Sequence, residues 1–106
     1  MNGGLTVLMT AYNGSAYLRT AIDSILQQMY RDFQFLIVDD ASTDDTREIV
    51  RSYQDSRIQL LCLKQNIGQT AALNVGLHTV STRWIARIDA DDYAAPSRLE
   101  EQMRAL

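Results

Sequence analysis

The sequence predicts an α/β domain in which a mostly parallel sheet lies between two layers of helices. Short apolar segments alternate four times with segments of helical periodicity along the 106 residues. The apolar segments are hydrophobic throughout, which is typical of strands buried on both faces. Strict alternation of strand and helix favours right-handed crossovers between parallel strands. The length, and a sequence without a linker, indicate that residues 1–106 form one domain.

The expected elements follow the apolar pattern in order. Strands are expected over residues 5–9, 33–38, 58–63 and 84–88. A helix is expected over residues 15–28, because the apolar side chains between positions 17 and 26 recur every three or four residues. Ser42 and Asn66 are expected to cap the next two helices. A last helical segment is expected over residues 97–106, and because no capping glycine follows it, the chain is expected to be truncated at its C-terminus.

The composition excludes some classes of partner. The net charge is −3 and the ten Lys and Arg residues are scattered, so a nucleic-acid surface is not expected. An anionic ligand would therefore need a cation or backbone N–H groups. The one cysteine, Cys62, excludes an internal disulfide, is consistent with the cytoplasm, and is interpreted as a buried thiol among leucines. No apolar stretch approaches the ~18 residues of a membrane span, so no membrane segment is expected in this chain.

Polar residues follow all four expected strands. In an open parallel sheet, ligands bind beyond the carboxyl ends of the strands, at the point where the strand order reverses. The residues that follow the strands are Thr10, Ala11, Tyr12 and Asn13, then Asp39 and Asp40, then Lys64, Gln65 and Asn66, and finally Asp89, Ala90, Asp91 and Asp92. These residues are the candidates for a binding site.

The strongest of these features is the group of three carboxylates from Asp89 to Asp92. Mg²⁺ or Mn²⁺ takes oxygen ligands and commonly joins one or two carboxylates to substrate phosphates. A cation here would also explain how an acidic protein holds a diphosphate. The alternative is a solvated acidic turn in which Asp91 or Asp92 caps the next helix.

The other polar residues also have two interpretations. Asp39 and Asp40 are compatible with ligand binding and, equally, with a turn at the end of a strand. Tyr12 is compatible with stacking on a base and with simple packing. The sequence contains no Gly-x-Gly-x-x-Gly after the first strand and no phosphate-binding loop of the Gly-Lys-Ser/Thr type, which disfavours dinucleotide-dependent and P-loop enzymes.

Four motifs together resemble the inverting family 2 glycosyltransferases. They are LTVLMTAYN at 5–13, LIVDDASTD at 36–44, NIGQTAALN at 66–74 and IDADD at 88–92. The resemblance covers nearly the whole chain and implies a GT-A, Rossmann-like fold of three α/β/α layers, of which this chain is the N-terminal, nucleotide-sugar-binding half. The family often has proline before the Tyr-Asn pair, whereas this chain has Thr10 and Ala11.

The resemblance also implies roles for individual residues. Thr10, Ala11 and Tyr12 would line the base pocket, Asp39 would bond the base, and Asp40 would support that loop. The implied nucleotide-sugar-binding residues are Thr10, Ala11, Tyr12, Asn13, Asp39, Asp40, Asn66, Asp89 and Ala90, and the implied ligands of Mg²⁺ or Mn²⁺ are Asp91 and Asp89.

The implied activity is transfer of a sugar from a nucleoside-diphosphate sugar, with UDP-sugar as the expected donor, to an acceptor sugar, lipid or protein in polysaccharide biosynthesis. The family's general base is expected beyond residue 106, so this chain would bind the donor without supplying the base. Two alternatives stay open: a module that binds nucleotide sugar without turnover, and a purely structural module. The edge of the strand at 84–88 is expected to favour a homodimer, and the parent protein could be membrane-associated.

Overall fold

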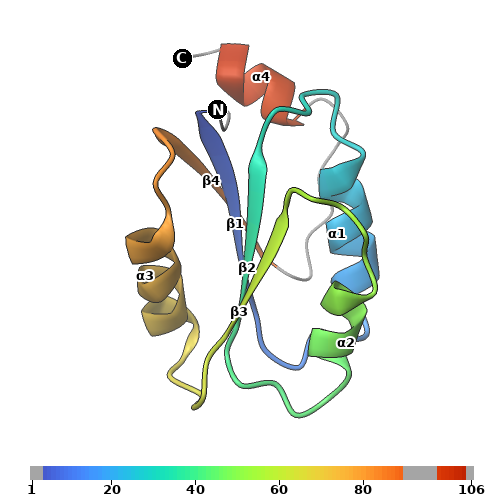
Figure 1. Cartoon of the computed structure of the whole chain (residues 1–106), viewed down its shortest axis with the longest axis vertical. Coiled ribbons are helices and arrows are strands. Elements are labelled where there is room, and N and C mark those ends of the chain that lie inside the picture. The colour runs from blue at the N-terminus through green and yellow to red at the C-terminus, as the bar shows by residue number, and fades with distance from the viewer. Residues whose placement is uncertain (1–3, 90–97, 105–106) are drawn as a thin grey trace.

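Parallel strands form a sheet in the order β3-β2-β1-β4 in the computed structural model, which describes residues 4–89 and 98–104. The strands are β1 (Leu5–Ala11), β2 (Gln34–Asp39), β3 (Ile58–Cys62) and β4 (Trp84–Asp89). The helices are α1 (Leu18–Leu26), α2 (Thr46–Arg51), α3 (Gln69–Thr79) and α4 (Arg98–Arg104). Figure 1 shows α1 and α2 on one face of the sheet and α3 on the other. The predicted α/β/α layering and parallel sheet are therefore confirmed.

The strand order reverses at β1, which is where the candidate residues meet. β1 pairs in parallel with β2 on one side and with β4 on the other. In this register Ala11 lies opposite Asp39, and Thr10 lies opposite Asp89. The carboxyl ends of three strands are therefore level, so their following residues surround one point, as the rule for open parallel sheets predicts.

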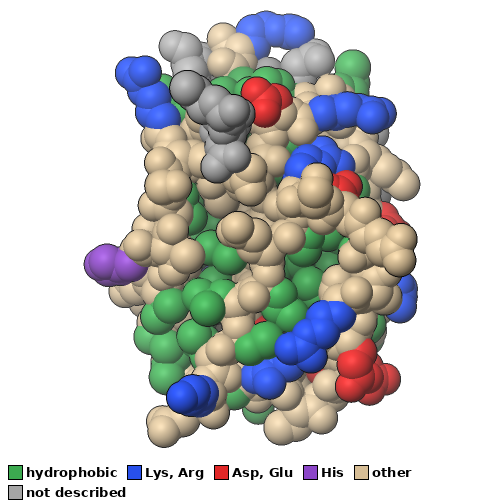
Figure 2. All heavy atoms as spheres, in the orientation of Figure 1, with side chains coloured by type: hydrophobic (Ala, Val, Ile, Leu, Met, Phe, Trp, Pro, Cys, Tyr) green, Lys and Arg blue, Asp and Glu red, His purple; other side chains and the backbone are tan. Residues whose placement is uncertain are grey.

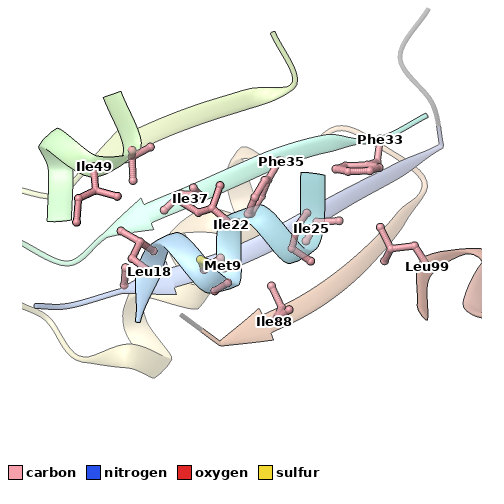
Figure 3. Packing of buried hydrophobic residues seen from close by; sticks show 14 of the residues in the cluster. Met9, Leu18, Ile22, Ile25, Phe33, Phe35, Ile37, Ile49, Ile88 and Leu99 are labelled. Carbon is pink, nitrogen blue, oxygen red and sulfur yellow. The ribbon is translucent and has the colours of Figure 1, made fainter. Parts of the chain in front are cut away.

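The hydrophobic core lies on both faces of the two central strands. On the α1 and α2 side, Met9, Ile22 and Ile37 belong to the larger cluster of buried side chains (Figure 3). On the α3 side a smaller cluster contains Leu8 and Ala72. Both faces of β1 and β2 are thus excluded from water, which explains why their sequences are apolar throughout.

The outer strands differ from the expectation. Strands β3 and β4 were expected to be buried on both faces, but Trp84 and Ile85 are 38% and 42% exposed, and Cys62 is half-buried instead of buried. Figure 2 shows hydrophobic side chains reaching the surface beside α3. Within the described residues these strands are the sheet edges, so each has a neighbouring strand on one side only. A strand at an edge is covered less completely, which the apolar pattern does not reveal.

The predicted helix caps at Ser42 and Asn66 are wrong. Helix α2 begins at Thr46 and α3 begins at Gln69, and the N-cap residues that the structure describes, Asp45 and Gly68, make no side-chain cap hydrogen bond. Ser42 Oγ instead accepts a hydrogen bond from the backbone N–H of Asn13 at 2.9 Å, and Asn66 Nδ2 donates to the Asp40 carbonyl at 3.2 Å. Both side chains bind across loops, and such bonds compete with local capping.

Gly76 allows α3 to pack closely on the sheet. A Cβ atom at this position would lie 2.6 Å from Leu8 Cδ1 and 3.1 Å from Val38 Cγ2. Real Cβ atoms do not approach carbon so closely, so a larger residue would push the helix away from β1 and β2. The position of α3 matters to the site because its N-terminus lies at the candidate cleft described below.

We expect Gly76→Ala to lower the free energy of unfolding by about 1–3 kcal/mol, because the added methyl group overpacks a filled interface. In a helix without this contact the same change would raise stability. Urea unfolding of the wild type and the variant measures the difference. Asn74→Ala, at an exposed position of α3, is the control and is expected to cause no loss. A Gly76→Ala variant as stable as the wild type would contradict the close packing.

Candidate functional site

A cleft of about 340 Å³ lies beyond the carboxyl ends of β1 and β4. Its lining consists of Thr10, Ala11, Tyr12, Asn13, Gly14, Tyr17, Asp40, Gln69 and Asp89. The structure thus brings together six of the residues that the sequence nominated. Among the described residues, Asp39 and Asn66 are not part of this lining, and Ala90 and Asp91 fall outside the described part of the chain.

The loop after β1 is tied to the loop after β2 through Asn13. Asn13 has a positive φ of 49°, and its side-chain Oδ1 accepts a hydrogen bond from the backbone N–H of Thr43 at 2.8 Å. Its own N–H donates to Ser42, and the next N–H, of Gly14, donates to Thr46 Oγ1 at 3.0 Å. The side-chain oxygen of Asn13 is therefore engaged by the protein, and Asn13 shapes one wall of the cleft.

Asp39 is a fully buried carboxylate at the end of β2. Its Oδ2 pairs with Arg47 Nε and accepts the backbone N–H of Ser42 at 3.3 Å. The hydrogen bond that Arg47 donates to Asp39 raises the pKa of Arg47, and Arg47 also donates to the Leu63 carbonyl at 3.0 Å. Among residues 4–89 and 98–104, no hydrogen-bond partner reaches Asp39 Oδ1. A buried polar atom in this condition calls for a partner from elsewhere, such as a ligand N–H.

Asp40 holds the loop that precedes α3. Its two carboxylate oxygens accept hydrogen bonds from the N–H groups of Ile67 at 2.8 Å and Gly68 at 3.0 Å. Its own N–H donates to the Ala11 carbonyl at 2.8 Å. Gly68 has a φ of 90°, which glycine adopts without the steric cost of a side chain. A buried carboxylate thus fixes where α3 begins.

Asp89 presents a carboxylate to the cleft from the end of β4. Its side chain is 44% exposed, and Arg87 Nη2 lies 3.8 Å from its Oδ1. The same oxygen accepts a hydrogen bond from Gln69 Nε2 at 3.1 Å. The carboxylate is therefore half-exposed and held from two sides, and it is oriented for contact with a polar ligand.

Two exposed tyrosines add aromatic surface to the cleft. Tyr12 is 51% exposed and Tyr17 is 61% exposed. Exposed rings of this size offer flat faces on which a base or a sugar can stack. The sequence pattern placed Tyr17 on the inward face of the first helix, which is wrong: it lies just before α1, in a turn where its N–H bonds the Gly14 carbonyl.

Three lining residues, Gly14, Tyr17 and Gln69, were missed by sequence reasoning. Gly14 and Tyr17 belong to the turn that leads into α1, and Gln69 is the first residue of α3. Whether each of these residues faces the cleft depends on a loop that is hydrogen-bonded to residues far away in the sequence. The Gly68 that precedes Gln69 was the only available signal, because a glycine there suggests a sharp turn beside the site.

The expected metal ligands are only partly within the described residues. Asp89 supplies carboxylate oxygens that suit Mg²⁺ or Mn²⁺, while Asp91 lies outside the described ranges. In residues 4–89 and 98–104 there is no group of three or more His, Cys, Asp or Glu side chains placed to hold a metal ion. No helix in these ranges is long and apolar enough to cross a membrane.

Comparison with known proteins identifies the class. The model of Glycosyl transferase family 2 matches residues 6–106, and the chain belongs to this family of glycosyltransferases. Its fold is that of GT-A transferase domains. The resemblance found in the four sequence motifs is thereby confirmed.

Three similar proteins illustrate the relationship. The UDP-Glc:alpha-D-GlcNAc-diphosphoundecaprenol beta-1,3-glucosyltransferase WfaP of Escherichia coli is 35% identical over 101 residues, which cover 93% of this chain and 39% of that protein. The structure of S. aureus TarS in complex with UDP-GlcNAc matches with a TM-score of 0.89 and 27% identity, over 98% of this chain and 30% of that one. Mannosyltransferase PcManGT from Pyrobaculum calidifontis, in complex with GDP-Man and Mn²⁺, matches with a TM-score of 0.88 and 26% identity, over 98% and 32%. The chain therefore spans well under half the length of these relatives.

Asp44 gives the loop network a testable pH dependence. Its Oδ1 accepts the N–H of Thr46 at 2.9 Å, and its Oδ2 accepts the N–H of Ser15 at 3.2 Å. Burial alone would raise the pKa of Asp44, but the hydrogen bonds from Thr46 and Ser15 favour the charged form and lower it from 3.8 to about 2.

We expect the charge of Asp44 to stabilise the fold above its unfolded pKa, and this contribution to be lost as the pH falls from about 4 to about 2. The free energies of unfolding of the wild type and Asp44→Asn should therefore converge over that interval. Urea unfolding at a series of pH values measures the difference. A difference between the two proteins that stays constant from pH 7 to pH 2 would contradict the assignment.

Proposed function

We propose that this chain is the donor-binding part of a glycosyltransferase that uses a UDP-sugar. The observation that carries the proposal is the cleft at the reversal of strand order, where Tyr12, Asp40 and Asp89 converge. The name of WfaP specifies UDP-Glc, and TarS is seen with UDP-GlcNAc, which supports uracil as the base. PcManGT is seen with GDP-Man, so GDP-sugar is the competing donor.

The base end of the donor belongs beside β1 and β2 in this proposal. Tyr12 offers an exposed ring for stacking, and Thr10 and Ala11 form the floor of the cleft. Asp39 Oδ1 is a buried acceptor for a base N–H group, because among the described residues no protein donor reaches it. Asn13 and Asn66 would support the site by hydrogen bonds that hold its loops in place. Ala90 is assigned to the donor site from the family resemblance alone.

The diphosphate and sugar end belongs beside β4. Asp89 would face the ribose or sugar and, with Asp91, would hold Mg²⁺ or Mn²⁺. The half-exposed carboxylate of Asp89 fits the oxygen ligands that these ions require, and PcManGT is seen with Mn²⁺. A bound cation would neutralise negative charge on the leaving nucleoside diphosphate.

The complete reaction needs parts of the protein beyond this cleft. The proposed acceptor is a sugar, a lipid or a protein, and the name of WfaP, which includes a sugar linked to diphosphoundecaprenol, favours a lipid-linked sugar. The general base is proposed to lie beyond residue 106. We place the chain in the cytoplasm, consistent with its single free thiol. Any membrane association of the parent protein would come from segments outside this chain.

A second candidate function uses the donor site alone, which in this chain is the cleft lined by Tyr12, Asp40 and Asp89. A nucleotide-sugar-binding module without turnover would use the same cleft. The two functions differ in one observation, which is whether sugar is transferred when donor, cation and acceptor are all supplied.

We expect UDP to bind in the presence of Mn²⁺ and to bind at least about 10-fold more weakly to Asp91→Ala or Asp89→Ala, because each variant removes oxygen ligands or donor contacts. Calorimetric titration of UDP, GDP and dTDP, with and without Mn²⁺, measures this and identifies the base. Asp32→Asn, an exposed residue just before β2, is the matched control and should bind as the wild type does. Failure of all three nucleotides to bind would overturn the proposal.

We also propose that the chain forms a homodimer through the edge of β4. Within the described residues β4 pairs only with β1, and its exposed Trp84 and Ile85 flank the open edge. We expect sedimentation to show a monomer–dimer equilibrium that Ile85→Lys shifts to monomer, since a charge at an edge strand opposes pairing. Leu77→Lys, which replaces a similarly exposed side chain on α3, should leave the equilibrium unchanged. Monomer alone across a wide concentration range would contradict the dimer.

A further inference from the structure

Gln69 connects α3 to β4 across the cleft. Its Nε2 donates a hydrogen bond of 3.1 Å to Asp89 Oδ1, and both side chains line the cleft. The two residues are 20 positions apart and belong to different elements. Arg87 Nη2 lies 3.8 Å from the same oxygen, so Gln69 provides the shorter contact to that side of the carboxylate.

The backbone of Gln69 is fixed by contacts that do not involve Asp89. The carboxylate of Asp40 accepts the N–H groups of Ile67 and Gly68, the two residues that precede Gln69. Further along α3, Gly76 sets the helix against Leu8. Contacts with β1 and β2 therefore determine where the backbone of Gln69 lies, while its side-chain amide reaches Asp89 of β4.

We infer that Gln69 is a positioning residue that orients the carboxylate of Asp89 for the nucleotide-sugar donor. The inference rests on the proposed function of the cleft. The hydrogen bond from Gln69 narrows the rotamers open to the half-exposed aspartate, so less side-chain freedom is lost when the donor binds. The Gln69 amide restrains one oxygen and adds no positive charge of its own beside Arg87, which lies 3.8 Å from the same oxygen.

A purely structural role for Gln69 makes a different prediction. Gln69 is exposed and occupies the first turn of α3, where a negative side chain interacts favourably with the helix dipole. Gln69→Glu keeps the length of the side chain and should leave the stability of the fold unchanged or raised. Glutamate at neutral pH accepts hydrogen bonds but does not donate them, so it cannot restrain Asp89 and would repel it.

The test is calorimetric binding of UDP with Mn²⁺ to the 106-residue chain. We expect Gln69→Ala to bind about 3- to 10-fold more weakly than the wild type, as for the loss of one hydrogen bond. Gln69→Glu should bind at least as weakly as Gln69→Ala while its thermal midpoint is not lowered. Gln54→Ala, an exposed glutamine in the loop after α2, is the matched control and should bind normally.

A double-mutant cycle with Asp89→Ala shows whether Gln69 acts through Asp89. Gln69→Ala should weaken binding in the wild type and have no further effect once Asp89 is alanine. Equal weakening in both backgrounds, or a Gln69→Glu variant that binds as well as the wild type, would overturn the inference while the proposed function stands. If the wild type binds no nucleotide, the proposed function fails, and the inference fails with it.

Discussion

Two adjacent carboxylates at the end of β2 hold the site together. Asp39 joins β2 to Arg47 of α2, and Asp40 joins it to the N–H groups that precede α3. Both residues are buried, and a buried charge is stable only when it is paired and hydrogen-bonded. Ala41, which directly follows Asp40, has a φ of 60°. This conformation costs a non-glycine residue about 1–2 kcal/mol. The surrounding bonds keep the chain in this conformation, as is common beside functional sites.

This arrangement sets the geometry of the cleft before any ligand arrives. The parallel register brings the ends of β1 and β4 level, and Asp40 then places the start of α3 opposite Asp89. Aromatic surface lies on the β1 side and carboxylate oxygen on the β4 side. A nucleotide sugar has a similar division, with a flat base at one end and, beyond the ribose, a charged diphosphate that carries the sugar. In the proposed function, this match lets an acidic chain accept an anionic donor with help from a cation.

The sequence was sufficient for the sheet and for nominating six of the residues that line the cleft, because apolar strands and the strand-end rule are local signals. It was insufficient where side chains bind partners far along the chain. Ser42 and Asn66 resembled helix caps but bind residues 29 and 26 positions away. Gln69 was missed although Gly68 precedes it, because its contact with Asp89 depends on how Asp40 sets the preceding loop. Cys62 was expected to be buried because the apolar pattern does not show which strands form the edges.

The central claim is that the donor binds in the cleft beside β1, β2 and β4. Nuclear magnetic resonance mapping of the chain titrated with a UDP-sugar and Mg²⁺ tests it most directly. The predicted result is a set of shifted backbone signals centred on Thr10, Tyr12, Asp40 and Gln69, with little change at the opposite end of the sheet. Shifts centred on the pocket around Thr6 and Thr82 at that opposite end would contradict the account.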